Sequence, residues 1–250
     1  MVHIVGAGSG AVDLITLRGK KYLEEADVVI YAGSLVNPEL LKFCSEDALI
    51  FNSAEMTLDQ VLEVVEKAEA EHKMTVRLHT GDPSIYGAIK EQMDAFDRKK
   101  IPYDVTPGVS SFLAAAASLK IEYTLPSISQ TVILTRISGR TLVPESESLQ
   151  KLAAHHATMC IFLSVDKIRD VVRELSQEYD LETPIAVVKK ASWADEKIIR
   201  GTLSTIADLV EFEHVDRTAM IIVGNCLGSN YELSKLYDKN FSHGFRIAET

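Results

Sequence analysis

Residues 75–87 read TVRLHTGDPSIYG and carry the clearest indication of the fold class. The first five residues are rich in β-branched and apolar side chains and predict a strand, after which Gly81 permits a tight turn. Pro83 suits the first turn of a helix, so we predict that a helix follows the turn directly. This order is typical of an α/β sheet, in which ligands bind beyond the carboxyl ends of the strands.

The same alternation extends from this stretch towards both ends of the chain. Short apolar runs alternate with helical periodicity, which predicts a mostly parallel sheet in the first half. A capping box at Thr57 predicts one helix start, and the irregular segment 120–127 reads as a linker. The predicted strands are 2–5, 27–31, 48–51, 75–79 and 103–106 before the linker, and 131–135, 159–163, 184–188, 197–201 and 220–223 after it.

The linker divides the chain into two α/β domains, which we predict at residues 1–122 and 123–250. Each has an ordinary domain size. The strands at 184–188 and 197–201 lie close together in the sequence and suggest a hairpin. A hairpin is antiparallel, so we expect a mixed sheet in the second domain.

Composition and charge exclude several classes of protein. The chain is 46% apolar and 25% charged, as in ordinary globular proteins, and 26 Lys+Arg against 36 Asp+Glu give a net charge of -10. This balance argues against nucleic acid or an anionic membrane as the partner. Three distant cysteines without a C-x-x-C spacing argue against a disulfide framework or a metal site. With neither a signal peptide nor an apolar run of about 18 residues, we expect a cytoplasmic protein.

The first glycine loop of the chain, GAGSGA at residues 6–11, follows the first strand and satisfies the dinucleotide-binding pattern G-x-G-x-x-G/A; the loop at Gly81 is the second. That fingerprint also requires a helix that begins within the motif and an acidic residue at the end of the second strand. Here the helix starts late, and the second strand is followed by Ala32 and Gly33. A nicotinamide-dependent oxidoreductase is therefore the weaker interpretation. The preferred one is a tight turn over which another group passes closely, because glycine lacks a Cβ.

The order and spacing of these motifs resemble those of the tetrapyrrole methylases over nearly the whole chain. This family binds S-adenosylmethionine in a cleft between two α/β domains, and we expect the same cleft here. Segments 31–38, 53–58 and 125–140 are similar to a branch that methylates precursors of cobalamin. Two departures are Ser9, where many members have Pro, and Thr80, where many have Gly. The motifs are residues 5–17, 81–87, 107–111, 161–164, 184–188, 201–203 and 219–224.

The resemblance implies S-adenosylmethionine as cofactor and assigns residues to its site. Methyl transfer from a sulfonium needs alignment in a dry cleft rather than a metal or a covalent nucleophile, so no catalytic residue is named. Asp82 fits either attraction of the methionine ammonium or a helix N-cap. The implied cofactor residues are Gly81, Asp82, Ile85, Tyr86, Ser110 and Ser111 in the first domain, with Phe162, Leu163, Ala191 and Ala219 in the second.

The acceptor implied by the resemblance is a macrocycle that bears many carboxylates. In a chain of charge -10, cations must outweigh the overall field at the site of such an acceptor. Arginine is suited to this because it pairs with carboxylates through two hydrogen bonds. The alternative interpretation of each cation near the expected site is a solvated surface charge. We predict that Arg18, Arg136, Arg140 and Lys189 contact the tetrapyrrole.

Several alternatives stay open at the level of the sequence. Within the family, the alternative targets are another ring position of the tetrapyrrole, a modified protein or ribosomal RNA. The acidic balance of the chain disfavours RNA. From other classes, the nicotinamide-dependent oxidoreductase and a non-catalytic interaction module remain. Titration with S-adenosylhomocysteine and with NAD separates the methylase from the oxidoreductase. The resemblance also implies a homodimer.

Overall fold

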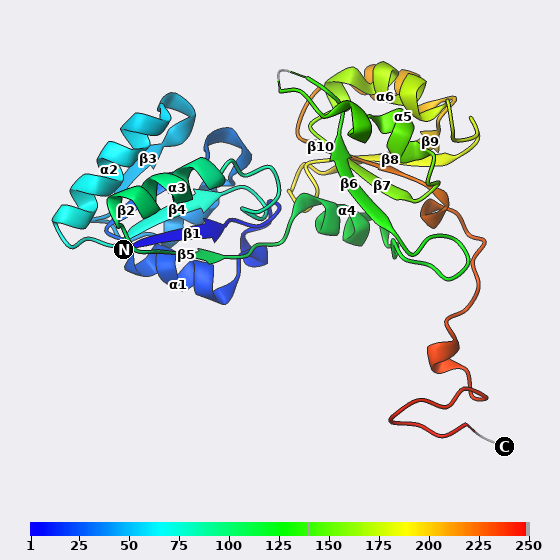
Figure 1. Ribbon diagram of the computed structural model, residues 1–250, viewed down its shortest axis with the longest axis horizontal. Coiled ribbons are helices and arrows are strands. Elements are labelled where there is room, and N and C mark those ends of the chain that lie inside the picture. Colours follow the sequence, from blue (N-terminus) through cyan, green and yellow to red (C-terminus); the bar gives the residue numbers. More distant parts are fainter. Residues whose placement is uncertain (140, 249–250) are drawn as a thin grey trace. The chain divides into compact units, whose positions relative to one another are not determined.

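The computed structural model describes residues 1–139 and 141–248 and divides the chain into two compact units, each with its own five-stranded sheet (Figure 1). The first unit consists of Met1–Ala115 and Lys190–Glu196, and the second of Ala116–Lys189 and Lys197–Thr250. Two α/β domains were predicted, and this fold class is confirmed. The boundary after residue 122 stays a prediction.

All strands of the first sheet run parallel, in the order β3-β2-β4-β1-β5. A parallel sheet with helices on both faces buries its strands, which explains their β-branched and apolar sequences. The carboxyl ends of all five strands therefore meet at one edge. The strands are β1 (Val2–Gly6), β2 (Val28–Tyr31), β3 (Leu49–Asn52), β4 (Thr75–His79) and β5 (Tyr103–Thr106).

Helices cover both faces of this sheet. The helix α1 (Leu17–Glu25) and the 3-10 helix η3 (Pro38–Phe43) pack against one face, and α2 (Leu58–Ala70) and α3 (Lys90–Lys99) against the other (Figure 1). The predicted capping box is confirmed, since Thr57 and Gln60 exchange both hydrogen bonds at the start of α2.

The expected helix start directly after the Gly81 turn is wrong. The helix α3 begins only at Lys90, and residues 82–89 form turns. Tyr86 and Ala88 have φ angles of 54° and 49°, in the left-handed region that an α-helix of L-residues avoids. The turn after β4 is therefore longer than the position of Pro83 suggested.

The second sheet is mixed, in the order β6-β7-β10-β8-β9. β6 and β7 are parallel and the other pairs antiparallel, including the predicted hairpin of β8 and β9. The residue pairings between these strands show that β6, β7 and β8 end at the same edge of the sheet and that β10 begins there. The strands are β6 (Val132–Arg136), β7 (Thr158–Phe162), β8 (Pro184–Lys189), β9 (Lys197–Thr202) and β10 (Ala219–Val223).

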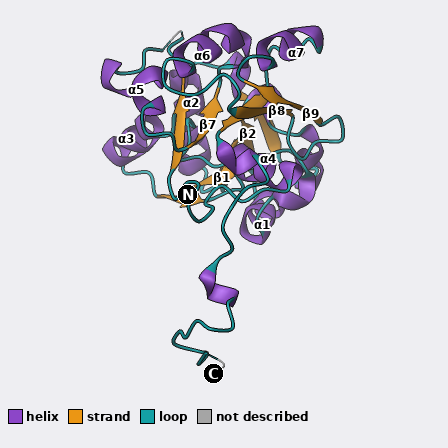
Figure 2. Ribbon diagram, turned by 90° about the vertical axis from the view of Figure 1, so that its right-hand side faces the viewer, coloured by secondary structure: helices purple, strands orange, loops and turns teal. Residues whose placement is uncertain are grey.

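Three helices share one hydrophobic core with the second sheet, namely α5 (Leu149–Ala153), α6 (Ile168–Leu175) and α7 (Ile206–Phe212) (Figure 2). In the sequence, α4 (Ser111–Leu119) crosses from the first unit to the second. Among the described residues, no helix is both long and apolar enough to span a membrane. The remaining 3-10 helices are η1 (Val12–Leu14), η2 (Gly33–Leu35), η4 (Ser53–Glu55), η5 (Glu145–Glu147), η6 (Val165–Lys167), η7 (Asn225–Leu227) and η8 (Lys235–Tyr237).

Candidate functional site

Three loops are joined to one another at the carboxyl edge of the first sheet. The Ala7 amide after β1 donates to the His79 carbonyl of β4 at 2.7 Å. Gly8 and Gly81 exchange two backbone hydrogen bonds, of 3.2 and 2.9 Å. The loop after β5 is joined to the loop after β4, because the Gly108 amide donates to Asp82 Oδ2 at 2.9 Å. The loops thus form one connected surface at the edge where α/β sheets bind ligands.

Glycine is required in these loops because backbone packs directly on backbone. A Cβ added at Gly108 would lie 2.1 Å from the Gly81 carbonyl oxygen, and one at Gly6 would lie 2.6 Å from Gly108 Cα. Gly81 has a φ of 61°, which glycine adopts without strain. The loops therefore approach one another more closely than side chains at these positions would allow.

The Asp82 carboxylate joins two of the loops. Besides the Gly108 amide, Asp82 Oδ1 accepts the Ser84 amide at 2.9 Å and also the Ser84 hydroxyl. Burial alone would raise the pKa of Asp82, but the hydrogen bonds from Ser84 and Gly108 lower it below its ordinary value. Asp82 is not a helix N-cap, since the N-cap of α3 is Ile89. It is an ionised group that holds the surface together.

The segment Lys190–Glu196, which connects β8 to β9, belongs to the first unit. Ser192 Oγ lies 2.9 Å from Ser9 Oγ and accepts the Ala11 amide at 3.0 Å, and Trp193 Nε1 donates to the Ser9 carbonyl at 3.0 Å. Ala191 is buried immediately before these contacts. The resemblance assigned Ala191 to the second domain, but its segment packs on the first glycine loop.

The contact with Trp193 confirms our interpretation of the first glycine loop. A Cβ at Gly10 would lie 2.0 Å from Trp193 Cδ1, so another group does pass closely over this turn. The loop continues into η1, and α1 begins only at Leu17. The nicotinamide fingerprint needs a helix that starts within the motif, and this geometry does not provide one.

The other first-unit candidates lie along the same loops. Ser110 is buried at the end of the loop after β5, and Ser111 begins α4. Ile85 and Tyr86 lie in the long turn after Asp82, where Tyr86 is half exposed. Apart from Ala191, the first-unit candidates therefore lie between β4 and the first residue of α4, on the segments that follow β4 and β5.

The second-unit candidates gather at one edge of the second sheet. Phe162, the last residue of β7, pairs with Arg136, and Ala219, the first residue of β10, pairs with Lys189. Leu163 follows Phe162 with a φ of 51° and is 63% exposed. This edge thus combines apolar side chains with two of the predicted substrate cations.

The predicted substrate cations differ in their surroundings. The Arg136 guanidinium donates to the carbonyls of Thr141 and Leu142, at 3.0 and 3.2 Å, so a loop holds it in place. Arg18 is exposed in the first turn of α1. Arg140 lies outside the described residues. The contact of these cations with the tetrapyrrole stays a prediction.

Sequence analysis missed a buried polar cluster beneath the second loop. Arg77 donates to the Gln92 side chain and to the Ile30 carbonyl, each at 3.0 Å. Burial, and then the nearby Arg77 charge, lowers the pKa of His79 to about 3, and its Nε2 has no hydrogen-bond partner among the described residues. The signal was the polar residues at alternate positions, 75, 77 and 79, of a buried strand, which place them on one face.

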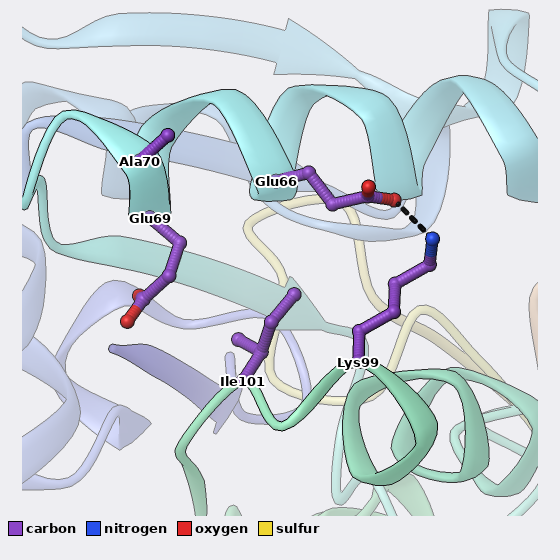
Figure 3. Close-up of a pocket in the computed structure, with 5 residues that line it drawn as sticks. All are labelled: Glu66, Glu69, Ala70, Lys99 and Ile101. Carbon is purple, nitrogen blue, oxygen red and sulfur yellow. Dashed lines mark ion pairs between the residues drawn. The ribbon is translucent and has the colours of Figure 1, made fainter.

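Two other features lie away from this edge. Asp104 accepts from His3 Nδ1 at 2.8 Å and from the Tyr22 hydroxyl at 3.2 Å, so it stabilises the contact of β5 with β1 and α1. A hollow lined by Glu66, Glu69, Ala70, Lys99 and Ile101 lies beside α2, with an ion pair of 2.8 Å between Lys99 and Glu66 (Figure 3). Ile101 precedes β5, so this hollow lies at the amino edge and not at the candidate site.

Metal-binding groups are not apparent at either edge. Within residues 1–139 and 141–248, no three His, Cys, Asp or Glu side chains are arranged to hold a metal ion. Cys44, Cys160 and Cys226 are free thiols, and burial raises the pKa of Cys160 to about 12. The groups that the two edges present are backbone atoms, the Asp82 carboxylate, cations and apolar side chains.

Known proteins are similar to this chain in sequence and in fold over nearly their whole length. A cobalt-precorrin-4 C(11)-methyltransferase of Methanocaldococcus jannaschii is 57% identical over 247 residues, which cover 98% of this chain and 95% of that protein. A precorrin-4 C(11)-methyltransferase of a Sinorhizobium species is 44% identical over 98% of both chains. The solved structure of a cobalt precorrin-4 methyltransferase of cobalamin biosynthesis superposes with a TM-score of 0.89, at 43% identity over 91% of this chain and 96% of that one.

The family assignment follows from these likenesses and from the glycine loops. The family model of the tetrapyrrole (corrin/porphyrin) methylases matches residues 1–207, which include both glycine loops and the segment that carries Ala191. The resemblance inferred from the sequence motifs is thus confirmed. The chain belongs to the tetrapyrrole methylase family.

Proposed function

We propose that the protein transfers a methyl group from S-adenosylmethionine to C-11 of precorrin-4 or its cobalt complex, in the biosynthesis of cobalamin. The observation that carries this proposal is the 57% identity, over 98% of the chain, to a relative that bears this activity in its name. The protein is a methyltransferase of the tetrapyrrole methylase family, and its products are the methylated tetrapyrrole, (cobalt-)precorrin-5, and S-adenosylhomocysteine.

The proposed cofactor site includes the connected loops of the first sheet. Its backbone amides and carbonyls suit the polar groups of the cofactor, and Ser110 adds a buried hydroxyl. Asp82 stays ionised at neutral pH because its pKa is lowered, so it complements the methionine ammonium. Bound S-adenosylmethionine supplies an electrophilic methyl group on a sulfonium. The full set is Gly81, Asp82, Ile85, Tyr86, Ser110, Ser111 and Ala191 from the first unit and Phe162, Leu163 and Ala219 from the second.

The chain's own contribution to the reaction is binding and orientation. Apolar walls such as Leu163 exclude water, which strengthens electrostatic interactions with the bound groups. Alignment of a carbon nucleophile with a methyl group can account for a large part of a rate enhancement without any protein nucleophile. A proton acceptor for the methylated carbon is not assigned. Asp104 is already paired with His3 and Tyr22, which disfavours it in this role.

We place the tetrapyrrole carboxylates against the cations at the edge of the second sheet and at the start of α1. Arg136 ends β6 and Lys189 ends β8 at the same edge, with β7 and β10 between these strands, and Arg18 and Arg140 complete the proposed set. A few local cations reverse the potential of an acidic protein within a confined site. Replacement of both Arg136 and Lys189 by Ala should weaken tetrapyrrole binding at least tenfold and leave S-adenosylhomocysteine binding unchanged. Equal tetrapyrrole affinity in this variant would remove the pair from the site.

A homodimer is the proposed assembly. The segment after Gly228 has its own hydrogen bonds, since Arg246 Nη2 donates to the carbonyls of Leu236, Asp238 and Phe241. Its large apolar side chains nevertheless lie outside, with Leu233, Tyr237, Phe245 and Ile247 between 81% and 101% exposed. Several large exposed apolar groups within one short segment favour a protein partner, here a second copy. Light scattering should give a dimer for the natural chain and a monomer for a Leu233→Ser/Phe245→Ser variant, and a monomeric natural chain would contradict the proposal.

The cytoplasm is the proposed location. All three cysteines are free thiols, which fits a reducing compartment. Fractionation of the source cells with an antibody against the protein should find it with the soluble cytoplasmic enzymes.

The function is tested by incubation with methyl-labelled S-adenosylmethionine and each form of the tetrapyrrole. One labelled methyl group should appear in the tetrapyrrole, and mass spectrometry detects it. Calorimetry should show binding of S-adenosylhomocysteine and none of NAD. Folded protein that binds S-adenosylhomocysteine but methylates neither substrate would reject the substrate assignment, and binding of NAD alone would favour the oxidoreductase instead.

A further inference from the structure

The proposed binding roles of the site residues do not explain the contact between the segment Lys190–Glu196 and the first glycine loop. The segment lies between two strands of the second sheet in the sequence, yet its contacts belong to the first unit. It reaches the loop through Ser192 and Trp193. Ala191, which precedes Ser192 in this segment, is one of the proposed cofactor residues.

Ser192 is the centre of this contact. Its hydroxyl accepts the Ala11 amide at 3.0 Å and pairs with the Ser9 hydroxyl at 2.9 Å. Its own amide donates to Glu196 Oε2 at 2.7 Å, which closes the segment on itself. One side chain therefore restrains both the glycine loop and the segment that carries Ala191.

Trp193 covers the same loop from above Gly10. Its indole donates to the Ser9 carbonyl at 3.0 Å, and there is no space for a Cβ at Gly10 beneath the ring. Lys190 Nζ lies 5.4 Å from the centre of the Trp193 ring system and pairs with Asp195 at 2.5 Å. From the other side of the loop, Asn37 Nδ2 donates to the Gly10 carbonyl at 2.8 Å. The loop 8–11 is thus held by groups from two distant parts of the chain.

The backbone of the segment indicates that its conformation is imposed by these contacts. Lys190 and Ser192 have φ angles of 50° and 70°, which L-residues seldom adopt. Such angles persist only when the surroundings determine them, and they cluster at binding sites. The observed strain therefore fits a segment whose geometry serves a neighbouring site.

We propose that Ser192 is a positioning residue of the methyltransferase: its hydroxyl locks the segment 190–196 onto the glycine loop and thereby places Ala191 and the loop for cofactor binding. The inference rests on the proposed cofactor site, because Ala191 belongs to that site. Ser192 itself touches no reacting atom. In this chain a serine stands at position 9, and its hydroxyl makes the second half of the lock, a contact that a proline at that position would lack.

Two variants of Ser192 separate positioning from folding. Ser192→Ala removes the hydroxyl, and Ser192→Gly removes it while also relieving the strained φ. We expect melting temperatures close to that of the natural protein for Ser192→Gly. Both variants should bind S-adenosylhomocysteine about tenfold more weakly, or about 1.4 kcal/mol. The Michaelis constant for S-adenosylmethionine should rise similarly, with kcat within about twofold. Ser45→Ala, an exposed serine of the same unit, is the matched control and should leave every value unchanged.

Hydrogen exchange of the backbone amides tests the contact of Ser192 with the glycine loop directly, without a bound ligand. The Ala11 amide should exchange at least tenfold faster in Ser192→Ala, because its acceptor is gone. The Ala7 amide, which donates to the His79 carbonyl, serves as the internal reference and should not change. A further check uses Gly10→Ala, whose loss of affinity should be partly relieved when Trp193→Ala removes the ring that the new Cβ would meet.

The outcomes distinguish this inference from the proposed function. If the natural protein binds no S-adenosylhomocysteine, the proposed function fails, and the lock is still judged by Ala11 exchange. If it binds, but both Ser192 variants bind equally well, Ser192 is not a positioning residue, whatever the exchange shows. Unchanged Ala11 exchange in Ser192→Ala would overturn the lock itself.

Discussion

The two edges that carry the candidate residues are built in different ways. The first is the edge where β1 to β5 end, and the second is the edge where β6, β7 and β8 end. At the first, backbone atoms of glycine loops contact one another, and the side chains of Asp82 and Ser192 connect the loops. At the second, side chains at strand ends form the surface, among them the exposed Leu163. The first edge therefore depends on a fixed backbone, whereas the second tolerates changes in shape and depends on charge and apolar character.

The largest expected difference between the edges comes from adding one methyl group to each. Gly108→Ala places a Cβ 2.1 Å from a backbone oxygen, and its nearest neighbours are all backbone atoms that cannot rotate away. We expect a loss of about 3 kcal/mol or more in the free energy of unfolding. The matched change near the second edge is Gly139→Ala, whose nearest atom is Lys167 Nζ at 3.9 Å. Urea denaturation should show almost no change for Gly139→Ala, and equal stabilities of the two variants would contradict the comparison.

A smaller difference is expected from removing a carboxylate at each edge. Asp82→Ala leaves the Gly108 amide without its acceptor, so the variant should lose about 2 kcal/mol in the free energy of unfolding. Asp166 is exposed in η6, just after β7, and Asp166→Ala should change stability by less than about 0.5 kcal/mol. Because the pKa of Asp82 is lowered, its contribution is present above its ordinary pKa and is lost as the pH falls through the value in the folded protein. Thermal unfolding at neutral pH measures both variants, and an unaffected Asp82→Ala would remove the carboxylate link.

The smallest expected effect concerns pH and the histidine beneath the first edge. The pKa of His79 is lowered to about 3, so below pH 6.5 the unfolded chain binds a proton there and the folded protein does not. Stability therefore falls as the pH falls from about 6.5 towards 3, and the natural protein should lose about 1 kcal/mol more than His79→Gln between pH 6 and pH 5. Identical pH profiles for the natural protein and His79→Gln would show that the pKa of His79 is the same in the folded and unfolded states, which would contradict its lowering by burial.

The pattern of the sequence predicted the strands well, because alternating apolar residues report burial on a sheet. Thr75–His79 and Tyr103–Thr106 agree with the structure at both ends, and the hairpin of β8 and β9 was also expected. The late start of α3 was not predicted, because Pro83 suggested a helix start and the left-handed angles at Tyr86 and Ala88 leave no periodic signal in the sequence.

The candidate site was predicted only in part, because the glycines leave a signal in the sequence and the contacts between distant residues do not. Glycines mark close approaches of the backbone, so Gly10 indicated that a group passes over the loop, but not that the group is Trp193. Contacts between residues about 180 positions apart, such as Ser9 with Ser192, leave no periodic signal in one sequence. The role of Asp82 as a link between loops also depends on a distant amide, that of Gly108, and could not be read from its neighbours.

The central claim is methyl transfer to one carbon of the tetrapyrrole. Its most direct test is a carbon-13 NMR spectrum of the product formed from S-adenosylmethionine labelled in the methyl group and cobalt-precorrin-4, with metal-free precorrin-4 in a parallel reaction. We predict one enriched methyl signal, with a coupling that places it on C-11, for at least one of the two substrates. An enriched methyl at another ring position, or none in either product, would contradict the account.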